Sequence, residues 1–88
     1  MEKDLTIVNR RGLHARASAK LVKLVETFEA EIEVSKDGQT VGGTSIMGLM
    51  MLAASTGCSI KVEAKGKEAE NAMEAITELV EDGFGETD

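Results

Sequence analysis

The segment NRRGLHARASAK, at positions 9–20, gathers residue types that could bind or transfer a small anionic group. It contains the only histidine of the chain, His14, and all three arginines, Arg10, Arg11 and Arg16. A neutral imidazole nitrogen is a nucleophile near neutral pH, and a guanidinium binds oxyanions through several N–H groups. The segment is therefore the first candidate for a functional site.

The residues after His14 predict the element that positions it. Apolar side chains recur at helical spacing over 15–27, which indicates an amphipathic helix. Ser18 is a suitable N-cap by residue type, but Gly12 breaks the chain earlier, so we place the helix start at Ala15 with His14 at the N-cap. The first N–H groups of a helix lack intrahelical partners and carry partial positive charge, so they bind anions and favour a neutral ring. This arrangement favours a phosphoryl group on His14, stabilised by the Arg16 side chain and the backbone N–H groups of Ala15 and Ala17.

The alternative interpretation is that His14 is an ordinary helix cap or an exposed side chain. No second histidine lies at ligand spacing and no cysteine lies nearby, so the chain does not indicate a zinc site. Residues 5–25 contain no acidic side chain, although the whole chain is acidic. The gathering of every arginine in this stretch favours a functional role for His14.

Composition limits which functions remain open. The chain of 88 residues suits one domain, spanning 1–88, with a small core. A net charge of −6 argues against nucleic acid and anionic membranes as main partners. The N-terminus has no secretory signal pattern, the longest apolar run is too short to span a bilayer, and Cys58 is the only cysteine. We expect a cytoplasmic protein with an inert, buried thiol at Cys58.

Hydrophobic patterning predicts an α+β fold. Alternation and turn residues indicate strands near 3–8, 30–36, 39–43 and 58–66, with a hairpin turn at Asp37–Gly38. Helical periodicity indicates helices over 15–27, 45–53 and 68–84, and the acidic tail at 85–88 is expected to fray. The order βαββαβα predicts an open-faced β-sandwich, in which three helices cover one face of a four-stranded antiparallel sheet.

A second motif, GGTSIMGLMMLAAS, begins at position 42. The spacing of residues 38–45, GQTVGGTS, resembles a phosphate-binding P-loop. Thr44 stands where that motif requires lysine, so we reject nucleotide hydrolysis. Ser45 is a suitable N-cap for the following helix. That helix is apolar nearly all round, and a core role is the default for such a stripe. On a small domain part of it should be exposed as a binding surface, and we expect Ile46, Met47 and Met50 to be exposed.

Together, GLHARASAK, GGTSIMGLMMLAAS and the βαββαβα order resemble the histidine-containing phosphocarrier (HPr) family of the bacterial phosphoenolpyruvate-dependent phosphotransferase system. The resemblance covers nearly the whole chain and implies that His14 accepts a phosphoryl group from phospho-enzyme I. His14 would then pass it to a histidine of a IIA-type protein, with Arg16 as electrostatic partner. It also implies that Ser45 matches the serine modified in some lineages by the ATP-dependent HPr kinase/phosphorylase. The family usually has proline where this chain has Ala17.

The resemblance further implies that the helices after His14 and Ser45 form the docking surface for enzyme I and IIA proteins. The expected docking residues are Lys20, Lys23, Ile46, Met47 and Met50. We expect a monomeric phosphotransferase component with a covalent phosphohistidine intermediate, not a stand-alone catalyst, and no metal or organic cofactor. The pathway is either sugar uptake or a nitrogen-related regulatory branch.

Two alternatives come from other classes. One is an acyl-carrier-like protein modified at Ser45, although the chain lacks the Asp-Ser pair of that family and its alternating strands contradict an all-helical bundle. The other is a regulatory binding protein without turnover, in which His14 would be incidental.

Overall fold

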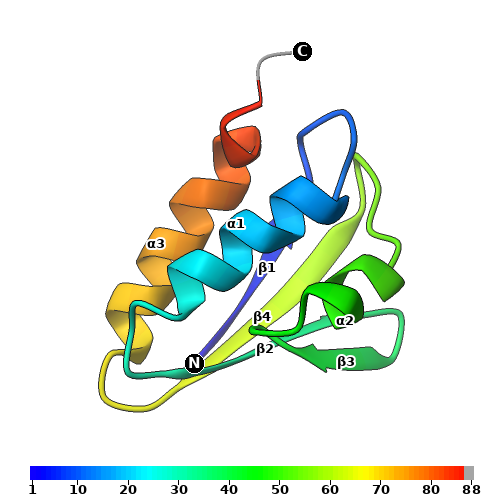
Figure 1. The fold of residues 1–88 in the computed structure, drawn as a ribbon. Coiled ribbons are helices and arrows are strands. Elements are labelled where there is room, and N and C mark those ends of the chain that lie inside the picture. The colour runs from blue at the N-terminus through cyan, green and yellow to red at the C-terminus, as the bar shows by residue number, and fades with distance from the viewer. Residues whose placement is uncertain (87–88) are drawn as a thin grey trace.

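Four antiparallel strands form one sheet, and three helices cover one of its faces (Figure 1). This computed structural model describes residues 1–86, and Thr87 and Asp88 lie outside the described part. The sheet order is β1-β4-β2-β3, and the predicted βαββαβα order and open-faced sandwich are confirmed. The elements are β1 (Glu2–Thr6), α1 (Ala15–Val25), β2 (Glu31–Lys36), β3 (Gln39–Gly42), α2 (Ile46–Met51), β4 (Ser59–Lys65), α3 (Ala69–Glu81) and the short 3₁₀ turn η1 (Gly83–Gly85).

The strands follow the alternation of the sequence. Val34 on β2 pairs with Val62 on β4, and Leu5 on β1 pairs with Ile60, all of them buried beneath the helices. On the other face the paired residues are polar, as in the pair Glu33 and Glu63. One largely aliphatic core, which also includes Phe84, therefore lies between the sheet and the helices, and α1 packs against both α2 and α3.

All three helices end earlier than the periodicity predicted, and α1 ends at Val25 where the predicted helix reached residue 27. The predicted helix over 68–84 ends at Glu81, because Gly83 and Phe84 adopt left-handed backbone angles, with φ values of 63° and 58°. The predicted helix over 45–53 ends at Met51, and Ala53 has a φ of 54°. Periodicity cannot detect these endings, since the side chains stay apolar while the backbone turns.

The β2–β3 hairpin agrees with its sequence signal. Asp37 and Gly38 both have positive φ, 49° and 84°, as a two-residue turn of the primed type requires. In the described range of 1–86, no helix is long and apolar enough to cross a bilayer.

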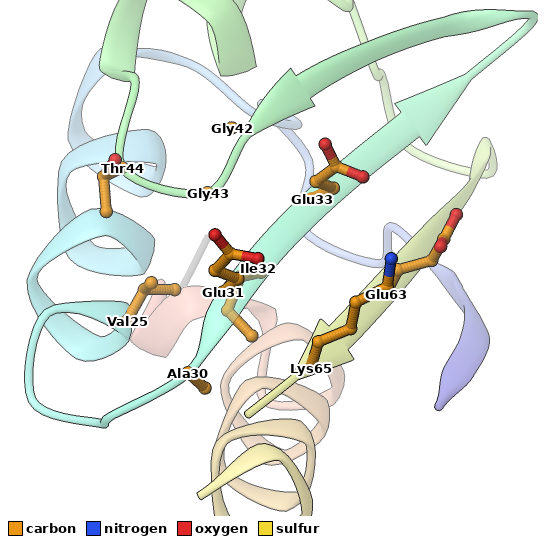
Figure 2. Close-up of a pocket in the computed structure, with 10 residues that line it drawn as sticks. All are labelled: Val25, Ala30, Glu31, Ile32, Glu33, Gly42, Gly43, Thr44, Glu63 and Lys65. Atoms are coloured by element: carbon orange, nitrogen blue, oxygen red, sulfur yellow. The ribbon is translucent and has the colours of Figure 1, made fainter. Parts of the chain in front are cut away.

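A groove of about 370 Å³ lies between the C-terminal end of α1, the start of β2 and the β3–α2 connection (Figure 2). Its lining includes the carboxylates of Glu31, Glu33 and Glu63. Val25 forms one wall, and Val25 stands at the opposite end of α1 from His14. At 1.5 Å per residue that separation is about 16 Å. The groove is therefore not part of the site around His14.

Candidate functional site

His14 is the N-cap of α1, as predicted, with an extended backbone (φ −76°, ψ −178°). The first intrahelical hydrogen bond runs from the N–H of Ser18 to the carbonyl of His14, at 2.9 Å. The N–H groups of Ala15, Arg16 and Ala17 precede that bond and have no partner within the helix. The imidazole therefore stands beside three donors and the positive end of the helix dipole.

The turn before His14 is held against the loop that follows α2. The N–H of Leu13 donates to the carbonyl of Ala54 at 2.9 Å. Gly12 has a φ of +66°, and a β-carbon there would lie only 2.3 Å from the same Ala54 oxygen. Only glycine combines this backbone angle with so close an approach. The position of His14 is therefore set by tertiary contacts as well as by the helix.

The His14 ring is partly exposed, with 19% of the side chain accessible, and Nε2 is hydrogen-bonded to Oε2 of Glu86. The other carboxylate oxygen of Glu86 accepts from Nδ2 of Asn9 at 3.1 Å. The hydrogen bonds from His14 and then Asn9 lower the pKa of Glu86, with a further contribution from the charges of His14 and Arg11, while burial opposes them. Glu86 is therefore held in its ionised form beside the imidazole.

The expectation that the tail at 85–88 frays is wrong for its first two residues. Phe84 is fully buried, its carbonyl accepts from Nζ of Lys20 at 2.6 Å, and Glu86 contacts His14. Thr87 and Asp88 lie outside the described residues. The sequence analysis did not predict a role for Glu86 or Asn9 at this site. An acidic tail that follows a phenylalanine, in a chain with one basic segment, could have indicated that the tail docks near His14.

Arg16 is exposed in the first turn of α1, and within residues 1–86 its side chain makes no hydrogen bond or ion pair. Its expected role beside a phosphoryl group stays a prediction. Ala17 is fully buried, so its methyl group belongs to the core while its N–H belongs to the first turn. Lys20 bonds to the tail and Lys23 is exposed.

Ser45 is the N-cap of α2, since its hydroxyl oxygen accepts from the N–H of Gly48 at 2.9 Å. Ile46, Met47 and Met50 are 40%, 71% and 40% exposed, which confirms the expected exposure, and Met51 is 69% exposed. Their role in docking stays a prediction. Because α2 packs against α1, this apolar surface lies next to the helix that begins at His14.

Cys58 does not meet the expectation of a buried thiol. It is only partly buried, and its sulfur lies 3.5 Å from the hydroxyl oxygen of Ser55. Hydrogen bonds from Ser55 lower the pKa of the Cys58 thiol. Among residues 1–86, no group of three or more histidine, cysteine, aspartate or glutamate side chains could hold a metal ion.

The His14 imidazole lies at the N-terminus of α1, and the exposed apolar helix α2 lies beside it. This arrangement is typical of a carrier domain, whose donor and acceptor proteins must dock on its surface. A family model described as "PTS HPr component phosphorylation site" matches residues 1–82. The phosphocarrier protein HPr of Cupriavidus necator is 44% identical over 86 residues, covering 98% of this chain and 97% of that protein. The chain therefore belongs to the HPr family, and it is a phosphocarrier of the phosphotransferase system.

Two further comparisons agree with this assignment. The phosphocarrier protein NPr of Shewanella violacea is 40% identical over 86 residues, covering 98% of this chain and 94% of that protein. The crystal structure of HPr from Thermoanaerobacter tengcongensis superposes with a TM-score of 0.94 at 40% identity, covering 99% of this chain and 98% of that one. The similarity therefore extends through sequence and fold over nearly the whole chain.

Proposed function

We propose that His14 carries the phosphoryl group, accepting it from phospho-enzyme I and passing it to a histidine of a IIA-type protein. The position of His14 at the N-cap of α1 is the main support for this proposal. Three backbone N–H groups that have no partner within the helix lie beside it. A phosphoryl dianion on the ring would accept hydrogen bonds from the N–H groups of Ala15 and Ala17. The exposed guanidinium of Arg16 would add charge stabilisation.

The contacts of the ring support an inference about which nitrogen reacts. Nε2 is hydrogen-bonded to Glu86, so we infer that Nδ1 is the nitrogen that attacks the incoming phosphorus. Phosphoryl transfer depends mainly on alignment and charge stabilisation. A partly exposed site suits this reaction, because the donor and acceptor proteins complete it when they dock.

The decisive experiment is incubation with phosphoenolpyruvate and enzyme I. Wild type should gain one acid-labile phosphoryl group, and His14→Ala should gain none. Ser45→Ala is the control variant, because it also replaces one polar side chain by alanine. It should gain as much phosphoryl label as wild type. Acid-labile labelling of the His14→Ala variant would refute the proposal, and so would a wild type that stays unlabelled. The second result would favour a regulatory binding protein without turnover.

For docking, we propose the surface formed by α1 and α2. The exposed apolar side chains of α2 supply contact area, and the lysines of α1 supply positive charge toward acidic partners. The residues are Lys20, Lys23, Ile46, Met47 and Met50. Met47→Asp should slow transfer from phospho-enzyme I at least tenfold, roughly the loss of one well-packed interface side chain. Asn71→Asp, which adds the same charge at an exposed position of α3, should leave the rate unchanged. Equal rates for both variants would contradict the proposed surface.

Ser45 is proposed as the site of regulatory phosphorylation by an HPr kinase/phosphorylase. Its hydroxyl is exposed at the start of α2, next to the proposed docking surface. A phosphate there would repel an acidic partner. Incubation with ATP and such a kinase should give an acid-stable label on wild type and none on Ser45→Ala. Label retained in the variant would refute this assignment.

The pathway and the assembly state belong to the same proposal. Reconstituted transfer to IIA proteins of the sugar and nitrogen-related branches would identify the branch by the faster acceptor. A monomer is proposed in solution, and sedimentation at micromolar concentration would test it. The acyl-carrier alternative loses its structural basis, since a four-stranded sheet contradicts an all-helical bundle.

A further inference from the structure

The C-terminal segment is built to bring one carboxylate to the His14 ring. Phe84 is fully buried although its φ of 58° is unfavourable for a residue with a β-carbon, so core packing holds the turn in place. Nζ of Lys20 donates to the Phe84 carbonyl at 2.6 Å. Two residues later, Glu86 reaches Nε2 of His14, with only 12% of its side chain exposed.

Asn9 determines how the carboxylate of Glu86 is held. Its side chain is buried, and Nδ2 donates both to the carbonyl of Gly12 at 2.8 Å and to Oε1 of Glu86 at 3.1 Å. A carbonyl and an ionised carboxylate are acceptors only, so the amide of Asn9 must present its nitrogen to both. Oε1 of Glu86 is therefore committed to Asn9, and Oε2 is the oxygen left for His14.

The contact with Glu86 decides which ring nitrogen carries the proton. An ionised carboxylate cannot donate, so Nε2 must be the donor in this hydrogen bond. In the neutral imidazole the other nitrogen, Nδ1, then carries the lone pair. The charged groups that act on Glu86 are His14 and Arg11, and both are cationic when charged, so they favour the ionised carboxylate.

We propose that Glu86 is a positioning residue for phosphoryl transfer, which keeps the proton on Nε2 and so makes Nδ1 of His14 the nucleophile. This inference rests on the proposed role of His14 as the carrier. In the transfer step the Nδ1 lone pair forms the N–P bond, while the bond from phosphorus to the donor breaks and its electron pair leaves with the donor. The proton stays on Nε2, and the ring becomes positively charged. The adjacent carboxylate of Glu86 stabilises that charge.

The geometry predicts an unusual order among variants of Glu86. In Glu86→Gln, the side-chain oxygen must face Nδ2 of Asn9, so its NH₂ group faces His14. Nε2 then has to accept, and the ring proton moves to Nδ1, which removes the nucleophile. Glu86→Ala leaves the ring without this partner, and both tautomers are populated. The chemically closer substitution should therefore be the more harmful one.

Two measurements test this order. Nitrogen NMR of the unphosphorylated protein at about pH 9, where an ordinary imidazole is neutral, reports which ring nitrogen is protonated. We expect the proton on Nε2 in wild type, on Nδ1 in Glu86→Gln, and on both in Glu86→Ala. Transfer from phospho-enzyme I should fall about 10–100-fold in Glu86→Gln and less in Glu86→Ala. Glu81→Gln makes the same change on the exposed end of α3 and should match wild type in both measurements.

Three results would overturn the inference. The first is one proton position shared by wild type and both Glu86 variants. The second is a larger loss of transfer in Glu86→Ala than in Glu86→Gln. The third is faster transfer in Glu86→Ala than in wild type. That result would mean that the Glu86 carboxylate only blocks the ring. The NMR measurement needs no phosphoryl donor, so it remains decisive if His14 fails to be labelled, and that failure would count against the proposed function alone.

Discussion

The burial of Phe84 should control both the stability of the domain and the position of its tail. Replacing a fully buried phenylalanine by alanine costs about 3–5 kcal/mol. A domain of 88 residues has a free energy of unfolding of about 4–13 kcal/mol, so Phe84→Ala removes a large share of it. With a denaturant slope of about 1.3 kcal/mol/M, the urea midpoint should fall by roughly 2–4 M.

The backbone at position 84 adds a sharper expectation. Alanine would keep the unfavourable φ of 58°, whereas glycine adopts it without steric strain. Glycine normally destabilises a folded chain relative to alanine by about 0.5–1 kcal/mol. Here the strain relief of about 1–2 kcal/mol should outweigh that penalty. Phe84→Gly should therefore be more stable than Phe84→Ala by about 0.5–1 kcal/mol.

Urea unfolding followed by circular dichroism measures both effects, and the imidazole signals of His14 report whether Glu86 has been released. Phe28→Ala is the matched control, because Phe28 is only partly buried and should lose less stability without altering His14. The reasoning fails if the free energy of unfolding of Phe84→Ala lies within about 1 kcal/mol of the wild-type value, since the expected loss is about 3–5 kcal/mol. It also fails if the alanine variant is the more stable of the two at position 84.

Three further predictions concern local features. Ser45→Ala removes the acceptor for the N–H of Gly48 and should lower the free energy of unfolding by about 1 kcal/mol, measured in urea, whereas no change would remove the capping role. Gly12→Ala should be destabilised more than Gly38→Ala, since both carry positive φ but only Gly12 meets a backbone oxygen; equal losses would contradict the close approach. Hydrogen bonds lower the pKa of Glu86 below its ordinary value of 4.5. Its carboxylate therefore stabilises the docked tail fully at pH values above 4.5, and this stabilisation is lost as the pH falls through the lowered pKa. Amide NMR signals of the tail should therefore move on acidification below pH 4.5, and release of the tail between pH 4.5 and 6 would refute this.

Much of the fold is encoded in local patterns, which is why it could be predicted before the structure was known. Alternation in β2 and β4 reports a sheet with one buried face, because side-chain direction repeats every two residues in a strand. The cap at Ser45 depends on neighbouring residues only, whereas the start of α1 at Ala15 is also held by the contact of Leu13 with Ala54. The candidate residue His14 was found in the same way, from the residue types clustered around it.

The tail escaped prediction because its position depends on contacts between residues far apart in the chain. His14 and Glu86 are separated by 72 positions, and Asn9 and Glu86 by 77. No periodicity links residues at such distances, and the burial of Phe84 in the shared core is what joins the two ends of the chain. The sequence alone thus determined the elements and the candidate nucleophile, through short-range propensity and patterning. Tertiary packing alone decided which ring nitrogen faces a carboxylate.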